Sequence, residues 1–186
     1  EPQTGSLAAL PEASLFESVM ARELARCQRF GYTCTVAVFA LTPWTTVHAH
    51  GLGLVNRVRG MFLCACKASV RSYDQIGWLV ENEGAILLPQ SDRWDADAVC
   101  RRIAHRFDLA VRQRAEGVDV TAQVGVVTFP FDGEDPRTLL EVARARCTSS
   151  TRARTSGSRA VAPRSPGSTA PSATARVTTR AAPSAS

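Results

Sequence analysis

The sequence lacks the patterns that define several large classes of protein. It has no Cys-x-x-Cys, and its six cysteines stand at no Cys/His spacing that suits a tetrahedral zinc site. No apolar run reaches the roughly 18 residues of a membrane span, and no signal-peptide pattern opens the chain. No glycine-rich phosphate loop occurs, and none of the three histidines (His48, His50 and His105) has a patterned Cys or Asp partner. We therefore expect a cytoplasmic domain without membrane contact, with buried reduced thiols, surface histidines, and no resident metal or cofactor.

Positive charge is concentrated at the end of the chain. The 186 residues carry a formal net charge of +5, while residues 148–186 contain six arginines, no lysine and no acidic residue. Subtracting those six charges from +5 leaves residues 1–147 at −1. The basic balance is therefore no reason to expect nucleic-acid binding by the folded part.

Composition divides the chain into three parts. Residues 1–11 read as a polar leader, residues 12–147 as one domain, and residues 148–186 as a tail of Ala, Arg, Ser, Thr and Pro. The tail has too little apolar surface to fold, so we expect it to be disordered. Because the chain starts at Glu1 rather than Met, we expect it to be a piece of a longer protein.

Hydrophobic periodicity predicts the elements of the domain. Apolar residues recur at helical steps over residues 12–30, 54–70, 91–114 and 137–147, and β-rich patterns cover residues 34–41, 74–88 and 118–129. In the helix at 91–114 we expect these side chains to face the core: Trp94, Ala98, Ile103, Phe107 and Val111. The order predicts an α+β, ferredoxin-like fold, in which helices pack on the antiparallel-rich sheet of a βαββαβ unit after an extra N-terminal helix.

Residues 70–89 are the most informative stretch of the sequence. Two apolar runs flank Glu81-Asn82-Glu83-Gly84, which predicts a hairpin whose Asn and Gly adopt positive φ. Trp78 is expected to pack in the interior, and Tyr73 is a candidate for stacking on a purine. Arg71 and Asp74 form an Arg-x-x-Asp pair just before the hairpin.

Three separate segments resemble the GGDEF domain of diguanylate cyclases. Residues 71–89 (RSYDQIGWLVENEGAILLP) are similar to its R-x-x-D, five-residue spacer, G-G-D/E-E-F signature and following strand. Residues 123–133 (QVGVVTFPFDG) resemble its S-I-G-V-A-x-x-P-x-D-G segment, and residues 12–41 resemble its leading helix and first strand. The resemblance covers residues 12–147 and implies the nucleotide-cyclase palm fold.

The sequence departs from the family at positions that the resemblance assigns to metal and GTP. Val80 and Glu81 stand in place of the two signature glycines, Asn82 replaces an acidic metal ligand, and Glu83 keeps its type before Gly84. The family's metal-binding aspartate at the end of the first strand falls at Ala40, and residues 33–49 contain no carboxylate. One carboxylate cannot hold two magnesium ions. We therefore expect no catalytic residues, and a domain that is not an enzyme.

The resemblance assigns Arg71 and Asp74 to the family's inhibitory product site, where Arg pairs with phosphate and Asp accepts from guanine of cyclic di-GMP. The alternative is a helix-terminal arginine in solvent beside an acidic turn residue. Our leading hypothesis is a regulatory or interaction domain of a larger bacterial signalling protein, whose partner is another domain of that protein or its own copy. The alternatives are a cyclic di-GMP receptor that uses this pair, and a residual diguanylate cyclase.

Family-like sequence stops abruptly at Cys147. The string Arg146-Cys147-Thr148-Ser149 can be encoded so that a shifted frame reads Leu-Tyr-Glu, and the family commonly continues here with A-L-Y-x-A-K. One hypothesis is that a frameshift produced residues 148–186, and the other is a natural disordered tail. The coding DNA separates the two.

Overall fold

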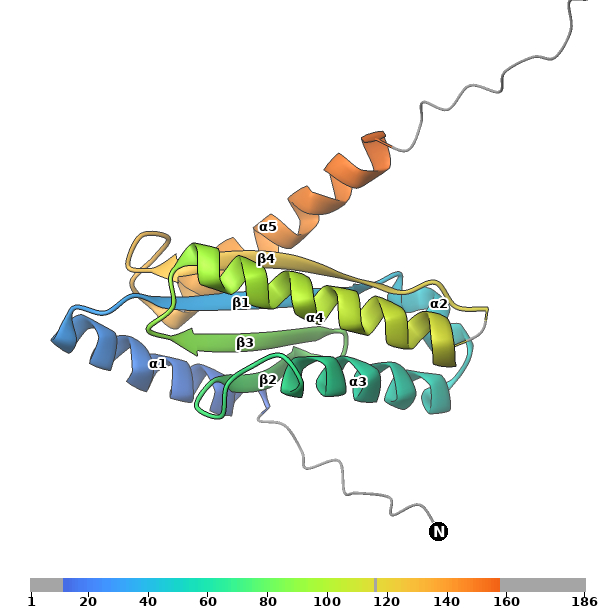
Figure 1. Cartoon of the computed structure of the whole chain (residues 1–186), viewed down its shortest axis with the longest axis horizontal. Helices are drawn as coiled ribbons and strands as arrows, with labels where there is room; N and C mark the ends of the chain where they lie inside the picture. The colour runs from blue at the N-terminus through green and yellow to red at the C-terminus, as the bar shows by residue number, and fades with distance from the viewer. Residues whose placement is uncertain (1–11, 116, 158–186) are drawn as a thin grey trace, which may run out of the picture.

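The computed structural model describes residues 12–115 and 117–157, with side chains described as far as Thr148. The predicted polar leader and the part of the predicted tail after residue 157 lie outside these residues. Four strands form one antiparallel sheet in the order β2-β3-β1-β4 (Figure 1). The strands are β1 (Cys34–Thr42), β2 (Gln75–Val80), β3 (Glu83–Pro89) and β4 (Thr121–Phe129). The helices are α1 (Ala13–Phe30), α2 (Trp44–Ala49), α3 (Leu52–Lys67), α4 (Arg93–Arg114) and α5 (Pro136–Gly157).

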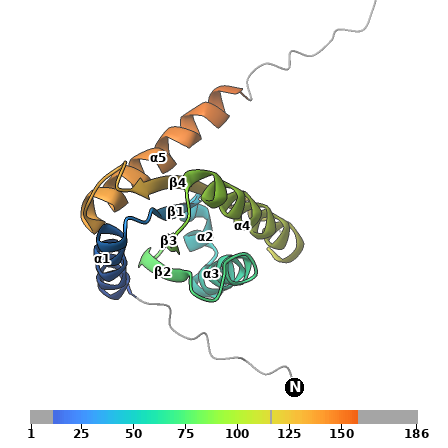
Figure 2. The same cartoon turned by 60° about the vertical axis from the view of Figure 1, so that its left-hand side comes forward.

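Strand β1 lies inside the sheet and is covered on both faces. Its side chains alternate, so that Val36 and Val38 join one buried cluster while Ala37, Phe39 and Leu41 join the other. Helices α1 and α5 supply the first cluster, and α3 and α4 supply the second. Figure 2 shows these two pairs of helices on opposite sides of the sheet. The predicted α+β fold with its βαββαβ unit and extra N-terminal helix is therefore confirmed.

Helix α4 differs from the prediction in the face that it buries. Its side chains in the core are Ala96, Cys100, Ile103, Phe107 and Val111. Trp94 is 82% exposed, so its predicted inward orientation is wrong, as is that of Ala98. The physical reason is the helical period, because a face that contains residues 96, 100 and 103 points away from position 94.

Helix α2 was not predicted from the sequence. It is six residues long and buries only Val47, so it has little of the periodicity that identifies a longer helix. The helix follows β1 directly and carries Trp44 and His48 toward the β2–β3 hairpin, as their contacts with Glu81 show. It therefore matters for the site despite its small share of the core.

The last helix joins the domain core up to Cys147. The Cys147 side chain is buried in the cluster of α1 and α5, and its Sγ lies 3.2 Å from the carbonyl oxygen of Val38. The backbone of α5 continues as helix to Gly157, ten residues past the predicted domain boundary. The boundary itself, and the origin of the tail, remain predictions.

The cysteines and the long helices agree in part with expectation. Five of the six cysteines are buried, but Cys64 is exposed, so the prediction of a buried thiol is wrong there. All three histidines are exposed, as predicted. None of the helices within the described residues combines the length and apolarity that crossing a membrane requires.

Candidate functional site

The β2–β3 hairpin closes with a shorter turn than the sequence predicts. Val80 pairs with Glu83, so the turn consists of Glu81 and Asn82, and Gly84 belongs to β3. Neither Asn82 nor Gly84 adopts a positive φ, which corrects the predicted turn conformation. Gly84 is required for packing instead, because a Cβ there would collide with the ring of Phe62.

Glu81 connects this turn to α2. Its Oε2 lies 2.7 Å from His48 Nε2 and accepts a longer hydrogen bond, of 3.4 Å, from Trp44 Nε1. The hydrogen bond with His48, and then that with Trp44, lowers the pKa of the Glu81 carboxyl below its ordinary value. The same turn also bonds to the sheet, since the Leu41 amide donates to the Asn82 carbonyl at 2.9 Å. The turn is therefore held from both α2 and β1.

Glu83 is engaged by the last helix. Arg144 Nε of α5 donates to Glu83 Oε2 at 2.8 Å, and Ala40 of β1 lies opposite Glu83 in the ladder. Within the described residues, no three His, Cys, Asp or Glu side chains gather closely enough to hold a metal ion. The donor set around the hairpin thus does not fit the pair of magnesium ions that the family resemblance implies, and we derive no step through such ions.

Arg71 and Asp74 lie in the loop between α3 and β2 and contact one another through the backbone. The Arg71 amide donates to Asp74 Oδ2 at 2.6 Å, while the Arg71 guanidinium donates to the Tyr73 hydroxyl at 2.8 Å. Burial raises the pKa of the Asp74 carboxyl above its ordinary value, against the opposing effect of the Arg71 amide and charge. The predicted pair is therefore brought together, with the carboxylate turned inward and the guanidinium exposed.

A pocket of about 180 Å³ opens beside this loop. Its lining includes Arg71 and Asp74 together with Ser69 and, from α4, Asp95 and Arg102. Arg102 Nη2 donates to the Ser69 carbonyl at 2.8 Å, which fixes α4 against the end of α3. Sequence reasoning missed Arg102, because it lies 28 residues beyond Asp74 among several other arginines of the same helix.

Two polar atoms in this pocket have unmet hydrogen-bonding capacity. Asp74 Oδ1 and Ser69 Oγ are the buried side-chain N or O atoms, among the described residues, without a hydrogen-bond partner. Leaving such atoms buried and unpaired costs about 1 to 3 kcal/mol each.

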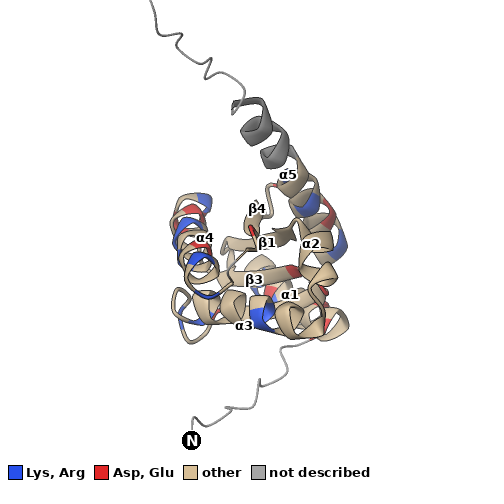
Figure 3. Cartoon of the chain, turned by 90° about the vertical axis from the view of Figure 1, so that its right-hand side faces the viewer, with Lys and Arg blue, Asp and Glu red and all other residues tan. Residues whose placement is uncertain are grey.

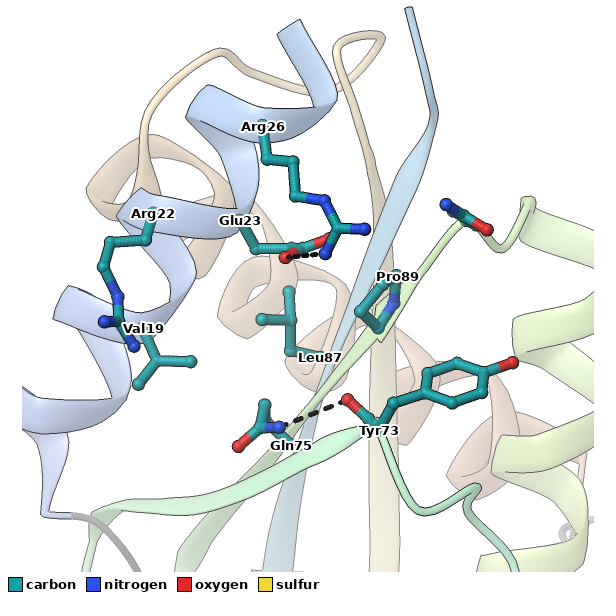
Figure 4. Close-up of a pocket in the computed structure, with 9 residues that line it drawn as sticks. Val19, Arg22, Glu23, Arg26, Tyr73, Gln75, Leu87 and Pro89 are labelled. Atoms are coloured by element: carbon teal, nitrogen blue, oxygen red, sulfur yellow. Dashed lines mark hydrogen bonds and ion pairs between the residues drawn. The ribbon is translucent and has the colours of Figure 1, made fainter. Parts of the chain in front are cut away.

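A second, larger cavity lies between α1 and the β2–β3 strands, and Tyr73 lines it. It has a volume of about 660 Å³ and is lined by Arg22, Glu23 and Arg26 from α1, facing Tyr73 and Gln75 (Figure 4). Glu23 pairs with Arg26 at 3.6 Å. Tyr73 therefore lines an arginine-bearing groove under α1, while its neighbour Asp74 lines the smaller pocket.

The arrangement of the sheet, with its hairpin next to an Arg-x-x-Asp loop, places the protein among nucleotide-cyclase palm folds. The sequence matches the family described as diguanylate cyclase, GGDEF domain, over residues 4–156, and the chain belongs to this family. No curated protein matches the sequence.

Solved structures support the same fold. Diguanylate cyclase SiaD from Pseudomonas aeruginosa, in complex with its activator SiaC, is 27% identical with a TM-score of 0.68, and the match covers 77% of this chain and 56% of that one. The GGDEF domain of DgcB from Caulobacter crescentus, in complex with c-di-GMP, is 17% identical with a TM-score of 0.67. The match covers 77% of this chain and 86% of that one. An active GGEEF domain of a diguanylate cyclase from Vibrio cholerae is 12% identical with a TM-score of 0.69. The match covers 77% of this chain and 92% of that one.

These relationships correct one prediction from the sequence. The expectation that the domain is not an enzyme is wrong, because the chain belongs to the diguanylate cyclase family and its solved relatives include enzymes of that name. The physical reason for the error is that it extrapolated from substitutions at Ala40, Val80, Glu81 and Asn82 to the whole site. Single positions define neither the fold nor the full set of groups that meet a nucleotide.

Proposed function

We propose that this chain is a cytoplasmic regulatory domain of a longer signalling protein and binds cyclic di-GMP at the pocket formed by Arg71, Asp74 and Arg102. The observation that carries the proposal is the buried, unpartnered Asp74 Oδ1, whose residue lines a pocket together with Ser69, Arg71 and Arg102. A buried carboxylate oxygen without a donor is costly unless a ligand supplies one.

The two residue types suit the two parts of the dinucleotide. A carboxylate accepts the adjacent N–H groups of a guanine edge, which would satisfy Asp74 Oδ1. Guanidinium groups donate in a planar fork to phosphate oxygens, which suits Arg71 and Arg102. The Arg71 amide already holds the other carboxylate oxygen at 2.6 Å, so the orientation of Asp74 is set before a ligand arrives.

Tyr73 adds an aromatic surface to the same loop. Its side chain is 53% exposed, and the Arg71 guanidinium carbon lies 5.8 Å from its ring centroid. Stacking on a purine would bury this ring without moving the backbone. The DgcB domain, which shares the fold and is in complex with c-di-GMP, supports this class of ligand.

Titration calorimetry with cyclic di-GMP tests the proposal. We expect saturable heat with the wild-type chain and at least a tenfold weaker Kd in Arg71→Ala, the loss that about 1.4 kcal/mol represents. Absence of heat in the wild type would contradict ligand binding and leave a domain that acts through protein contacts. The complex of SiaD with its activator is a precedent for such contacts in a relative.

Synthesis of cyclic di-GMP from GTP is a second candidate, favoured by membership of the diguanylate cyclase family. Incubation with GTP and magnesium, followed by chromatography of the products, tests it. If the chain is a cyclase, the dinucleotide accumulates, and Glu83→Gln lowers the rate because Glu83 is the signature carboxylate retained by type. A reaction mixture that contains GTP alone after long incubation contradicts this candidate.

A further inference from the structure

An open cleft of about 500 Å³ lies at the opposite end of α4 from the Asp74 pocket. Three separate segments line it: His50 follows α2, Leu54 and Arg57 belong to α3, and Gln113 and Arg114 end α4. Arg102 and Arg114 are 12 residues apart on one helix, which is roughly 18 Å along its axis. The two sites are therefore distinct.

Basic side chains gather at the cleft. None of the described residues that line it is Asp or Glu, and residue 116 lies outside the described part of the chain. Arg57 and Arg114 form no ion pair with any residue that the structure describes, whereas the neighbouring Arg112 pairs with Asp108 at 3.1 Å. Figure 3 looks onto this end of the molecule and shows basic positions on α3 and both basic and acidic positions on α4. Like charges that converge from different elements repel one another, and a bound anion would relieve that repulsion.

His50 contributes a directed polar group to the same cleft. Its Nδ1 lies 2.8 Å from the Thr46 carbonyl oxygen, which can only accept, so the proton resides on Nδ1. Nε2 is the ring nitrogen that this contact does not use. The Thr46 contact thus orients the ring at the rim of the cleft.

Apolar side chains also line the cleft. Val118 is buried and Leu54 is half-buried. Guanidinium groups bind phosphate oxygens through paired N–H donors, and two of them beside an imidazole suit a group with several anionic oxygens. We propose that this cleft binds a small molecule that carries a diphosphate group, held by Arg57, Arg114 and His50.

Proton NMR of the histidine rings, with inorganic pyrophosphate as the probe, tests this site in the full chain. The chain has three histidines, so the Cε1–H resonance of His50 can be assigned with His50→Gln. We expect its shift to saturate with pyrophosphate, and Kd to rise at least tenfold in Arg57→Gln/Arg114→Gln. Arg112→Gln is the matched control, because it removes an arginine from the same helix end outside the lining, and it should leave Kd unchanged.

The histidine readout separates this site from other sources of positive charge. The arginines of residues 152–180 attract anions in every variant, but they do not explain a selective, saturable shift of His50. A His50 shift that does not saturate, or that survives the double substitution unchanged, overturns the proposal. An equal response to citrate overturns the assignment to a diphosphate group.

Discussion

Ala40 of β1 lies opposite Glu83 of β3, and Glu83 Oε2 accepts a hydrogen bond from Arg144 Nε at 2.8 Å. The carboxylate that the signature hairpin retains is therefore paired with a cation from the last helix. No carboxylate stands across from it on β1, where Ala40 presents only a methyl group. Side chains of α2 and α5 thus add polar contacts to the strand pairing and packing that hold the hairpin, and its stability can be tested residue by residue.

Gly84 is a position where the hairpin has no room for a side chain. A Cβ added there would meet the ring of Phe62, so we expect Gly84→Ala to lower the free energy of unfolding by about 1 to 3 kcal/mol. Gly60→Ala is the matched control, because the α3 position has no atom within 4 Å of an added Cβ and should gain up to about 1 kcal/mol. Urea unfolding measures both, and equal effects of the two substitutions would contradict the packing role of Gly84.

Asp132 should stabilise the fold at neutral pH. Arg146 Nη1 donates to Asp132 Oδ2 at 2.9 Å, and this side-chain hydrogen bonding lowers the pKa of the carboxyl below its ordinary 3.8. The folded state therefore favours the charged form, so the contribution is present above about pH 4 and is lost as pH falls through the lowered pKa.

The test compares Asp132→Asn with wild type across pH. We expect a loss of about 1 to 2 kcal/mol at pH 7 that shrinks below the ordinary pKa of 3.8. Glu141→Gln breaks an exposed i,i+4 pair with Arg137 and should cost less than about 0.5 kcal/mol. A loss for Asp132→Asn that persists undiminished at pH 2 would contradict the ionic origin.

The contribution of Asp74 to the stability of the fold should have the opposite dependence on pH. Burial raises its pKa above 3.8, so the folded state favours the protonated form. The stabilisation by protonated Asp74 is complete below its ordinary pKa and disappears as pH rises through its raised pKa in the folded state. At pH 7 the folded protein therefore contains a buried charge. We therefore expect Asp74→Asn to raise the free energy of unfolding at pH 7 and to have no effect below about pH 3.8. If Asp74→Asn instead lowers stability at pH 7, while the exposed control Asp119→Asn changes nothing, the result contradicts a destabilising buried charge on Asp74.

Trp78 of the hairpin and Trp94 of α4 should differ sharply in how much they contribute to stability. Trp78 is 9% exposed, with its ring 5.4 Å from that of Phe62 and 4.5 Å from the Arg59 guanidinium carbon. Trp78→Ala should cost about 3 to 5 kcal/mol, whereas Trp94→Ala should change stability by less than about 0.5 kcal/mol. Equal losses in urea unfolding would show that Trp94 is covered in the folded protein.

The sequence predicted the order of strands and long helices because their patterns are local. The prediction for the buried face of α4 is wrong at Trp94. Near the start of a helix, the side on which a residue lies depends on which residue forms the N-cap. Asp92 fixes that start, as its Oδ1 accepts from the Asp95 amide at 2.9 Å.

The site was predicted less completely than the fold, because its groups come from distant segments. Arg71 and Asp74 are close in sequence and were found, but Arg102 reaches the same pocket from α4 through tertiary packing. The contact of His48 with Glu81 likewise spans 33 residues. Pairwise contacts of this kind leave no periodic signal in a single sequence.

Calorimetric titration of cyclic di-GMP into Arg102→Ala and Arg101→Ala tests the proposed site most directly. Arg101 and Arg102 are adjacent on α4, but only Arg102 lines the Asp74 pocket and bonds to the Ser69 carbonyl. We predict that Arg101→Ala binds as the wild type does and that Arg102→Ala binds at least tenfold more weakly. Equal affinity of the two variants, or equal loss in both, would contradict a ligand site built on Arg71, Asp74 and Arg102.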